Sequence, residues 1–213
     1  MKTHDLIERL ATRSPALPGN PLRSGLLAGL LLAVAASLSL MMVIYGHPAL
    51  AALASASPTW WFALLSCLAI LAAGTFALLR AARPGPFPVA RTLLPLGILL
   101  ILLLGTVLTY SVIEPVRGVG TAGTAGWTQC LMCIPLFALP AMLILFVSMR
   151  TAAPSAPRGT GALVGLIAGA SGAVAFSCCS LTGITALMTL WYGLAIILCA
   201  VAGALAGGRF FRW

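Results

Sequence analysis

The sequence predicts an all-α, polytopic membrane protein with six transmembrane helices and both termini in the cytoplasm. Three observations support this prediction. Hydrophobic residues make up 61% of the 213 residues, charged residues only 7%, and the mean hydropathy is +1.11. Six apolar stretches each approach the roughly 20 residues that a helix needs to cross a bilayer. The basic residues fall almost entirely on alternate sides of these stretches.

Each apolar stretch is hydrophobic on all sides, whereas a strand of a membrane barrel alternates apolar and polar residues. Each stretch must therefore satisfy its own backbone hydrogen bonds as a helix. The predicted spans are Leu26–Tyr45, Trp60–Leu79, Leu93–Ile113, Cys130–Met149, Ala162–Cys178 and Ile184–Gly207.

Small residues and prolines predict how these helices pack. Glycines at four-residue spacing let helices approach closely, and they occur as Gly25 and Gly29, as Gly161, Gly165 and Gly169, and as Gly203 and Gly207. Pro135 and Pro140 interrupt the fourth span, which predicts a kink there. Trp60 and Trp61 lie at a span end, where tryptophan is typical of an interfacial anchor.

The loops orient the chain, because Lys and Arg are retained on the cytoplasmic side of a membrane. Eleven basic residues precede the first span, lie between the second and third or the fourth and fifth, or follow the sixth, while the intervening loops carry only Arg117. Both termini are thus predicted in the cytoplasm. The net charge of +9 is read as this topology signal plus attraction to anionic lipid. Because the charge is split among short segments, we expect no direct binding of nucleic acid.

Residues 1–23 are predicted to form a cytoplasmic N-terminal segment, and residues 24–213 the six-helix transmembrane domain. Glu8 follows Asp5 by three residues, as in a capping box, and Leu6, Ile7 and Leu10 share one face of the turn that follows. A helix of two or three turns is marginal alone in water. The segment is therefore expected to order against a partner or the membrane surface, the alternative being a disordered leader that only carries positive charge.

Four cysteines are predicted to gather at the outer side of the bilayer. The fourth span begins there with Cys130 and Cys133, and the fifth ends there with Cys178 and Cys179. They converge provided that the two spans are neighbours, which the short connecting loop favours. A Cys-x-x-Cys near a helix start favours the thiolate and places both thiols on one face.

Adjacent Cys178 and Cys179 point in different directions on a helix, so at most one should face the fourth span. Thiols in an oxidising compartment are candidates for disulfide formation or for binding soft metals. The alternative is that these cysteines are small apolar packing residues, the interpretation that we give to Cys67 and Cys199.

The sequence contains few features that would indicate a transporter or an enzyme. The spans hold no clearly buried ionisable group, which disfavours a proton-coupled transporter. No phosphate loop, Ser/His/Asp set or zinc-hydrolase motif is present, so we expect neither an enzyme nor a bound cofactor. Two alternatives stay open. A quinone-coupled membrane thiol oxidoreductase would need accessible cysteines and a cation near the quinone, and a soft-metal permease would need cysteines at both faces.

Four segments together resemble the NrsF-type negative regulators of extracytoplasmic-function sigma factors. These segments are the opening Met1 to Ile7, the stretch Trp127 to Pro135, the glycine-rich Gly161 to Gly169, and the end from Trp191 to Trp213. Members of this family are six-span inner-membrane anti-sigma factors of Gram-negative bacteria. The resemblance implies that cytoplasmic segments hold a sigma factor and release it under heavy-metal or oxidative stress through two cysteines. In this chain the implied sigma-binding residues are Asp5, Leu6, Ile7, Arg9 and Leu10.

The resemblance also implies which thiols sense the stress. The first family cysteine matches Cys130, three residues after Trp127. The second normally lies in a His-Cys-Pro-Glu-like context, which corresponds here to Phe176-Ser-Cys-Cys-Ser180, so Cys179 is the preferred match and Cys178 the alternative. The Pro and Glu are missing and an extra thiol replaces the His, so the sensing chemistry here can differ from that of the family. If a metal is bound, Cys130 and Cys179 are the expected ligands.

Overall fold

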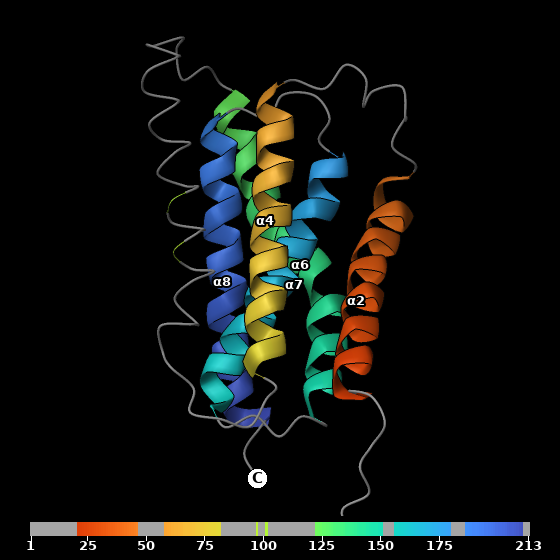
Figure 1. Ribbon diagram of the computed structural model, residues 1–213. Coiled ribbons are helices and arrows are strands. Elements are labelled where there is room, and N and C mark those ends of the chain that lie inside the picture. Colours follow the sequence, from red (N-terminus) through yellow and green to blue (C-terminus); the bar gives the residue numbers. More distant parts are fainter. Residues whose placement is uncertain are drawn as a thin grey trace, which may run out of the picture.

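The computed structural model describes residues 21–46, 58–81, 97, 101, 122–150, 156–179 and 186–210, and these residues form helices and no strand. The helices are α2 (Pro21–Tyr45), α4 (Pro58–Ala81), α6 (Ala122–Arg150), α7 (Pro157–Cys179) and α8 (Ala186–Phe210). Figure 1 shows them side by side in a bundle. The all-α prediction is therefore confirmed over the described part of the chain.

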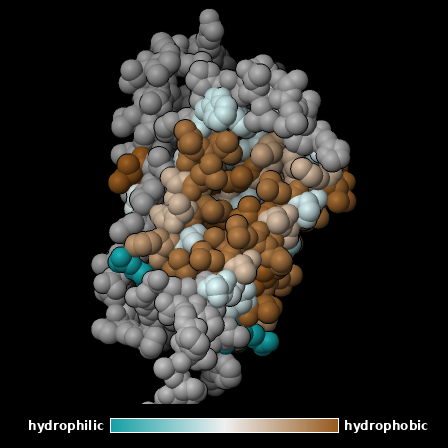
Figure 2. Space-filling view, turned by 45° about the vertical axis from the view of Figure 1, so that its right-hand side comes forward, coloured by the Kyte–Doolittle hydropathy of each residue, from teal (hydrophilic) through white to brown (hydrophobic). Residues whose placement is uncertain are grey.

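Each of these five helices is long and apolar enough to cross a membrane, which identifies a membrane protein. They coincide with the first, second, fourth, fifth and sixth predicted spans. Of the third predicted span, Leu93–Ile113, the structure describes Gly97 and Ile101, both helical. Figure 2 shows a broad apolar surface over the described helices, with hydrophilic residues at its margins. Such a surface suits contact with lipid chains.

Local sequence explains where several helices begin and end. Proline is the first residue of α2, α4 and α7, a position where its missing N–H costs nothing and its fixed φ suits a helix. At the other end of α2, Gly46 adopts a left-handed φ of +79° and its N–H donates to the Met42 carbonyl at 3.0 Å. This glycine cap ends α2 at Tyr45.

The helix α7 lies at the centre of the bundle. It contacts each of the other four described helices, most extensively α8. In its spanning window 83% of the residues are buried, against 28–39% in the other four helices. The other helices therefore face the surroundings with most of their residues, while α7 faces mainly protein.

Glycines set the contact between α7 and α8, as their spacing predicted. A Cβ added at Gly165 would overlap the carbonyl oxygen of Cys199, and one at Gly203 would overlap that of Gly161. In α2, a close contact is found at Gly29, the second glycine of the predicted pair. A Cβ at Gly29 would lie 3.1 Å from the Ser148 Cβ of α6, but no described residue lies within 4 Å of the corresponding position at Gly25. The packing role predicted for Gly25 stays a prediction.

The two ends of the bundle differ in charge. Arg80, Arg150 and Arg209 lie in the last turns of α4, α6 and α8, and Arg158 is the second residue of α7. Figure 1 places these helix ends at one end of the bundle, together with the start of α2. We call it the basic end. It encloses a hydrophobic cluster that includes Leu26, Leu78, Leu145, Leu163 and Cys199.

A second hydrophobic cluster fills the opposite half of the bundle. Its buried members include Met41, Cys67, Cys130, Phe176 and Tyr192. Cys133 and Cys178 are partly buried and pack against it. We call this the thiol end, and the group of residues the thiol-end cluster.

Candidate functional site

The predicted convergence of cysteines required that α6 and α7 be neighbours, and they are in extensive contact. A close approach at Gly172 fixes this pairing. A Cβ added there would lie 2.5 Å from the Ile134 carbonyl oxygen and 3.0 Å from the Ala138 nitrogen. This contact surrounds Pro135, through which α6 continues as one helix. The thiol-bearing part of α6 therefore lies beside the end of α7.

The structure brings three of the four predicted sensing thiols to the thiol-end cluster. Cys130 is 1% exposed and belongs to its core, while Cys133 and Cys178 pack against it from partly buried positions. Cys179 is the last residue of α7, and its side chain lies outside the part of the chain that the structure describes. The cysteines whose side chains are described are free thiols: Cys67, Cys130, Cys133, Cys178 and Cys199.

The predicted setting of the Cys-x-x-Cys pair at a helix start is wrong. The helix α6 begins at Ala122, so Cys130 lies more than two turns inside it. The partial positive charge of a helix start acts only within about one turn. It therefore gives these thiols no support as thiolates. Their distinctive feature is burial among apolar side chains, with Cys133 more accessible than Cys130.

A tyrosine from α2 reaches one of these thiols. The hydroxyl of Tyr45 and the Sγ atom of Cys133 are hydrogen-bonded at 3.3 Å. The rings of Tyr45 and Phe137 also pack in a T-shaped arrangement, with centroids 6.2 Å apart. No sequence pattern predicts this contact, because the two residues lie 88 positions apart.

A tryptophan from α4 forms a hydrogen bond with the last turn of α7. The indole Nε1–H of Trp60 donates to the Ser177 carbonyl at 2.9 Å, directly before Cys178. The last four carbonyls of a helix have no partner within the helix, and Trp60 satisfies one of them. Trp60 is 1% exposed, so its predicted place as an interfacial anchor is wrong, whereas its neighbour Trp61 is 47% exposed.

Cys67 is the residue whose position the sequence analysis missed. It lies on α4, 3% exposed, in the same thiol-end cluster as Cys130. Its burial agrees with the packing role that we assigned to it. Cys67 lies in the first half of the second predicted span, which begins at the outer side. This position could have predicted that Cys67 lies at the same end of the bundle as the other thiols. Cys199 instead belongs to the cluster at the basic end.

Among the described side chains, no three of His, Cys, Asp or Glu lie close enough together to hold a metal ion. The predicted pair of metal ligands, Cys130 and Cys179, includes a side chain outside the described part and stays a prediction. A soft metal held by two thiolates would not require three described ligands. The described geometry is therefore compatible with a reaction that uses two thiols.

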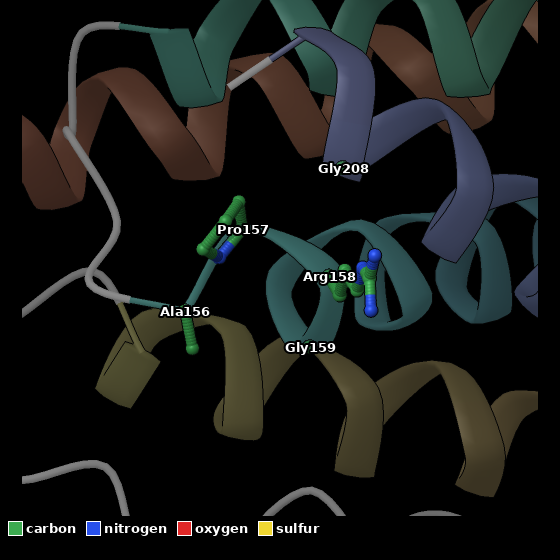
Figure 3. Close-up of a pocket in the computed structure, with 5 residues that line it drawn as sticks. All are labelled: Ala156, Pro157, Arg158, Gly159 and Gly208. Atoms are coloured by element: carbon green, nitrogen blue, oxygen red, sulfur yellow. The ribbon is translucent and has the colours of Figure 1, made fainter. Parts of the chain in front are cut away.

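A pocket of about 320 Å³ lies away from the thiols, at the basic end. Figure 3 shows its lining at the start of α7, formed by Ala156, Pro157, Arg158 and Gly159, with Gly208 of α8 opposite. The lining contains no nucleophile and no acidic group. We therefore assign the candidate site to the thiol end and not to this pocket.

The fold and the site together define a helical membrane protein in which four of the five described thiols gather at one end of the bundle, opposite the basic end. The family model NrsF, described as negative regulator of sigma F, matches residues 10–213, and the chain belongs to this family. This confirms the resemblance drawn from the sequence. No curated protein and no solved structure matches the chain. The predicted sigma-binding residues lie outside the described part, and of these only Leu10 falls within the matched range.

Proposed function

We propose that this protein is a membrane-bound anti-sigma factor of the bacterial inner membrane. It sequesters an extracytoplasmic-function sigma factor and releases it when thiols at the outer side sense a heavy metal or an oxidant. The observation that carries the proposal is the family match over residues 10–213, which gives a negative regulator of a sigma factor. The gathering of Cys130, Cys133 and Cys178 in one cluster supports a sensor at the thiol end.

The sensing reaction joins Cys130 with Cys179. A soft divalent metal replaces two S–H bonds with two S–metal bonds and releases two protons to water. A two-electron oxidant such as a peroxide instead takes two electrons and two protons, leaving a disulfide. Either product changes how the ends of α6 and α7 pack. Packed helices have discrete arrangements and do not deform continuously, so a local change can reach the basic end.

The release of the partner needs only a modest energetic bias. A 100-fold loss of affinity corresponds to about 2.7 kcal/mol, and the signal must favour one packing over the other by a similar amount. The partner is held by the N-terminal segment through Asp5, Leu6, Ile7, Arg9 and Leu10. The buried helical position of Cys130 weighs against the alternative oxidoreductase, which needs thiols in an accessible loop.

Variants at the two ends of the molecule test this assignment. The readout is a promoter that becomes active when the gene for this protein is deleted. Cys130→Ser with Cys179→Ser should keep this promoter repressed without stress and abolish its induction by cadmium or chromate. Leu6→Asp with Leu10→Asp should raise transcription without stress, because charge on the apolar face removes the contact with the partner.

A normal cadmium and chromate response in the cysteine double variant would refute the thiol sensor. Full repression by the Leu6/Leu10 double variant would remove the N-terminal segment from the mechanism. Cys199→Ser is the matched control for the thiols, since Cys199 lies in the cluster at the basic end. It should respond as the unchanged protein does.

A further inference from the structure

The basic end of the bundle carries positive charge that no described carboxylate balances. It has four exposed arginines, one from each of α4, α6, α7 and α8. The chain has only three acidic residues, and none of them falls in the part that the structure describes. Arg80 lies over the ring of Phe76 on its own helix, 4.2 Å from the ring centroid. The described part of the basic end therefore attracts anions.

Another of these arginines, Arg158, lines the pocket of about 320 Å³ between the start of α7 and the end of α8. This volume is at the lower end of the range of small-molecule sites, about 300–1,000 Å³. A Cβ added at Gly207, which precedes Gly208 of the lining, would lie 2.7 Å from the Pro157 carbonyl oxygen. Because α8 thus rests directly on the first turn of α7, a backbone contact fixes the shape of the pocket. The pocket has the size of a polar headgroup and not of a whole lipid.

The missing side chain at Gly208 determines where the stem of Arg158 lies. A Cβ added at Gly208 would lie 3.3 Å from the Cγ atom and 3.5 Å from the Nε atom of Arg158. The stem of Arg158 therefore packs against the end of α8, and Figure 3 shows the two residues beside each other. A guanidinium group is planar and offers several N–H donors in a fork that matches two oxygens of a phosphate or a carboxylate. Arg158 thus supplies the pocket with a group that binds such an anion.

An apolar stripe on α8 leads to the same pocket. Leu198, Val201 and Leu205 are exposed, and Gly208 continues their face of the helix at a spacing of three or four residues. From Leu198 to Gly208 the helix rises about 15 Å, which is about half the thickness of the hydrocarbon core of a bilayer. The stripe therefore has the length of one leaflet. A free phosphate or an acidic peptide would use the charge alone, whereas a phospholipid uses both the pocket and the stripe.

We propose that the pocket between α7 and α8 binds the phosphate of an anionic phospholipid. Arg158 is its main ligand, and an acyl chain of the lipid lies along the stripe on α8. Basic pockets between transmembrane helices bind anionic headgroups in this way. A zwitterionic headgroup carries a cation of its own and gains less from the four arginines. The site lies at the end of the bundle opposite the thiols, and it does not depend on the proposed function.

Lipid binding to the purified full-length protein tests this site. Native mass spectrometry of the protein in detergent measures the fraction that retains phosphatidylglycerol during a titration. The salt concentration is held at about 0.15 M, where charges more than about 8 Å apart are largely screened. Arg158→Gln should weaken binding about tenfold, because it removes a charged donor to the phosphate. Arg158→Lys should restore part of the affinity, since it keeps the charge but loses the fork.

Arg80→Gln is the matched control for charge. It removes the same charge from the basic end, but Arg80 lies on α4 and does not line the pocket. It should retain phosphatidylglycerol as the unchanged protein does. Equal losses in Arg80→Gln and Arg158→Gln would show attraction by the total charge only, and would overturn the pocket as the site.

Gly208→Leu tests the pocket without any change of charge. The described neighbour of a Cβ at this position is the flexible side chain of Arg158, so the two helices do not have to move apart. The leucine fills the space in which the headgroup lies, so binding should fall as in Arg158→Gln. Thermal unfolding in detergent without added lipid checks that the variant is folded. Unchanged binding by a folded Gly208→Leu variant would refute the site.

Three further comparisons identify the occupant. Phosphatidylcholine should be retained less than phosphatidylglycerol, and inorganic phosphate at the same concentration should not displace the lipid. Equal retention of the two lipids, or displacement by phosphate, would overturn the assignment to an anionic phospholipid. Sigma factor that co-purifies with the protein should not depend on Arg158. If it falls in Arg158→Gln while lipid retention stays the same, the pocket is a protein interface and the proposal is wrong.

The lipid site and the thiol sensor can fail separately. Cys130→Ser with Cys179→Ser should retain phosphatidylglycerol as the unchanged protein does, because the thiols take no part in the pocket. A loss of lipid in this double variant would contradict the independence of the two ends. A normal cadmium response in the same variant refutes the sensor and leaves the lipid site standing.

Discussion

At the scale of single residues, the thiol end is organised by side chains that bond between helices. Many hydroxyls serve their own helix, as Thr75 does by donating to the Leu71 carbonyl at 2.6 Å. Trp60 and Tyr45 instead reach across to α7 and α6. The sequence placed Trp60 and Trp61 at the same depth, but successive helix positions point about 100° apart. Only packing decides which indole is buried.

Trp60→Phe should destabilise the protein and loosen the end of α7. The change leaves the buried Ser177 carbonyl without its indole donor, which costs about 1–3 kcal/mol. Unfolding of the purified protein in detergent by denaturant measures the free energy, and maleimide labelling of Cys178 should become faster. Trp61→Phe is the control at the exposed neighbouring position. Equal effects of the two replacements would contradict the capping role of Trp60.

At the scale of elements, apolar length located the described spans well but misplaced the start of α6. The helix α6 begins at Ala122 and not near Cys130, because residues 122–129 are too polar and glycine-rich to count as a span yet still form helix. Because the start of α6 was placed too late, Cys130 and Cys133 were wrongly predicted to lie near the start of a helix. Glycine spacing succeeded for α7 and α8, where two glycine faces meet. At Gly25 no described neighbour lies opposite, and spacing alone does not say which helix packs there.

Gly165→Ala should weaken the contact between α7 and α8. The added methyl group would collide with the backbone at Cys199, which cannot move aside as a side chain can. Overpacking of this kind costs about 1–3 kcal/mol or more, so the free energy of unfolding in detergent should fall by at least that amount. Gly25→Ala is the matched control, since no residue in the described part of the chain lies within 4 Å of the new methyl group. A similar loss in both variants would refute the glycine contact as its cause.

At the scale of the whole molecule, the alternation of basic loops predicted that the starts and ends of specific helices lie together. The structure places the arginine-bearing ends of α4, α6, α7 and α8 at one end of the bundle, beside the start of α2. Which end faces the cytoplasm depends on the membrane and not on the fold, so the orientation stays a prediction. The sequence also could not give the contacts of Tyr45, which depend on how distant helices pack.

Labelling of intact cells tests the orientation. A membrane-impermeant maleimide added outside the inner membrane should react with Cys133 at the thiol end. In a variant with Arg209→Cys and without the native thiols, the same reagent should react only after the cells are broken, because Arg209 lies in the last turn of α8. The reverse pattern would place the thiols at the cytoplasmic side and end the sensor proposal.

The shielded position of α7 has a consequence for biogenesis. In α7, 83% of the residues in the spanning window are buried by other helices. If its glycine-lined side faced lipid, α7 would lose its close contacts with these helices. Its most extensive partner, α8, follows it in the chain. During synthesis α7 therefore enters the bilayer before its main binding surface exists. Chains that stop ahead of α8 should be recognised as unfinished and degraded by the proteases of the membrane.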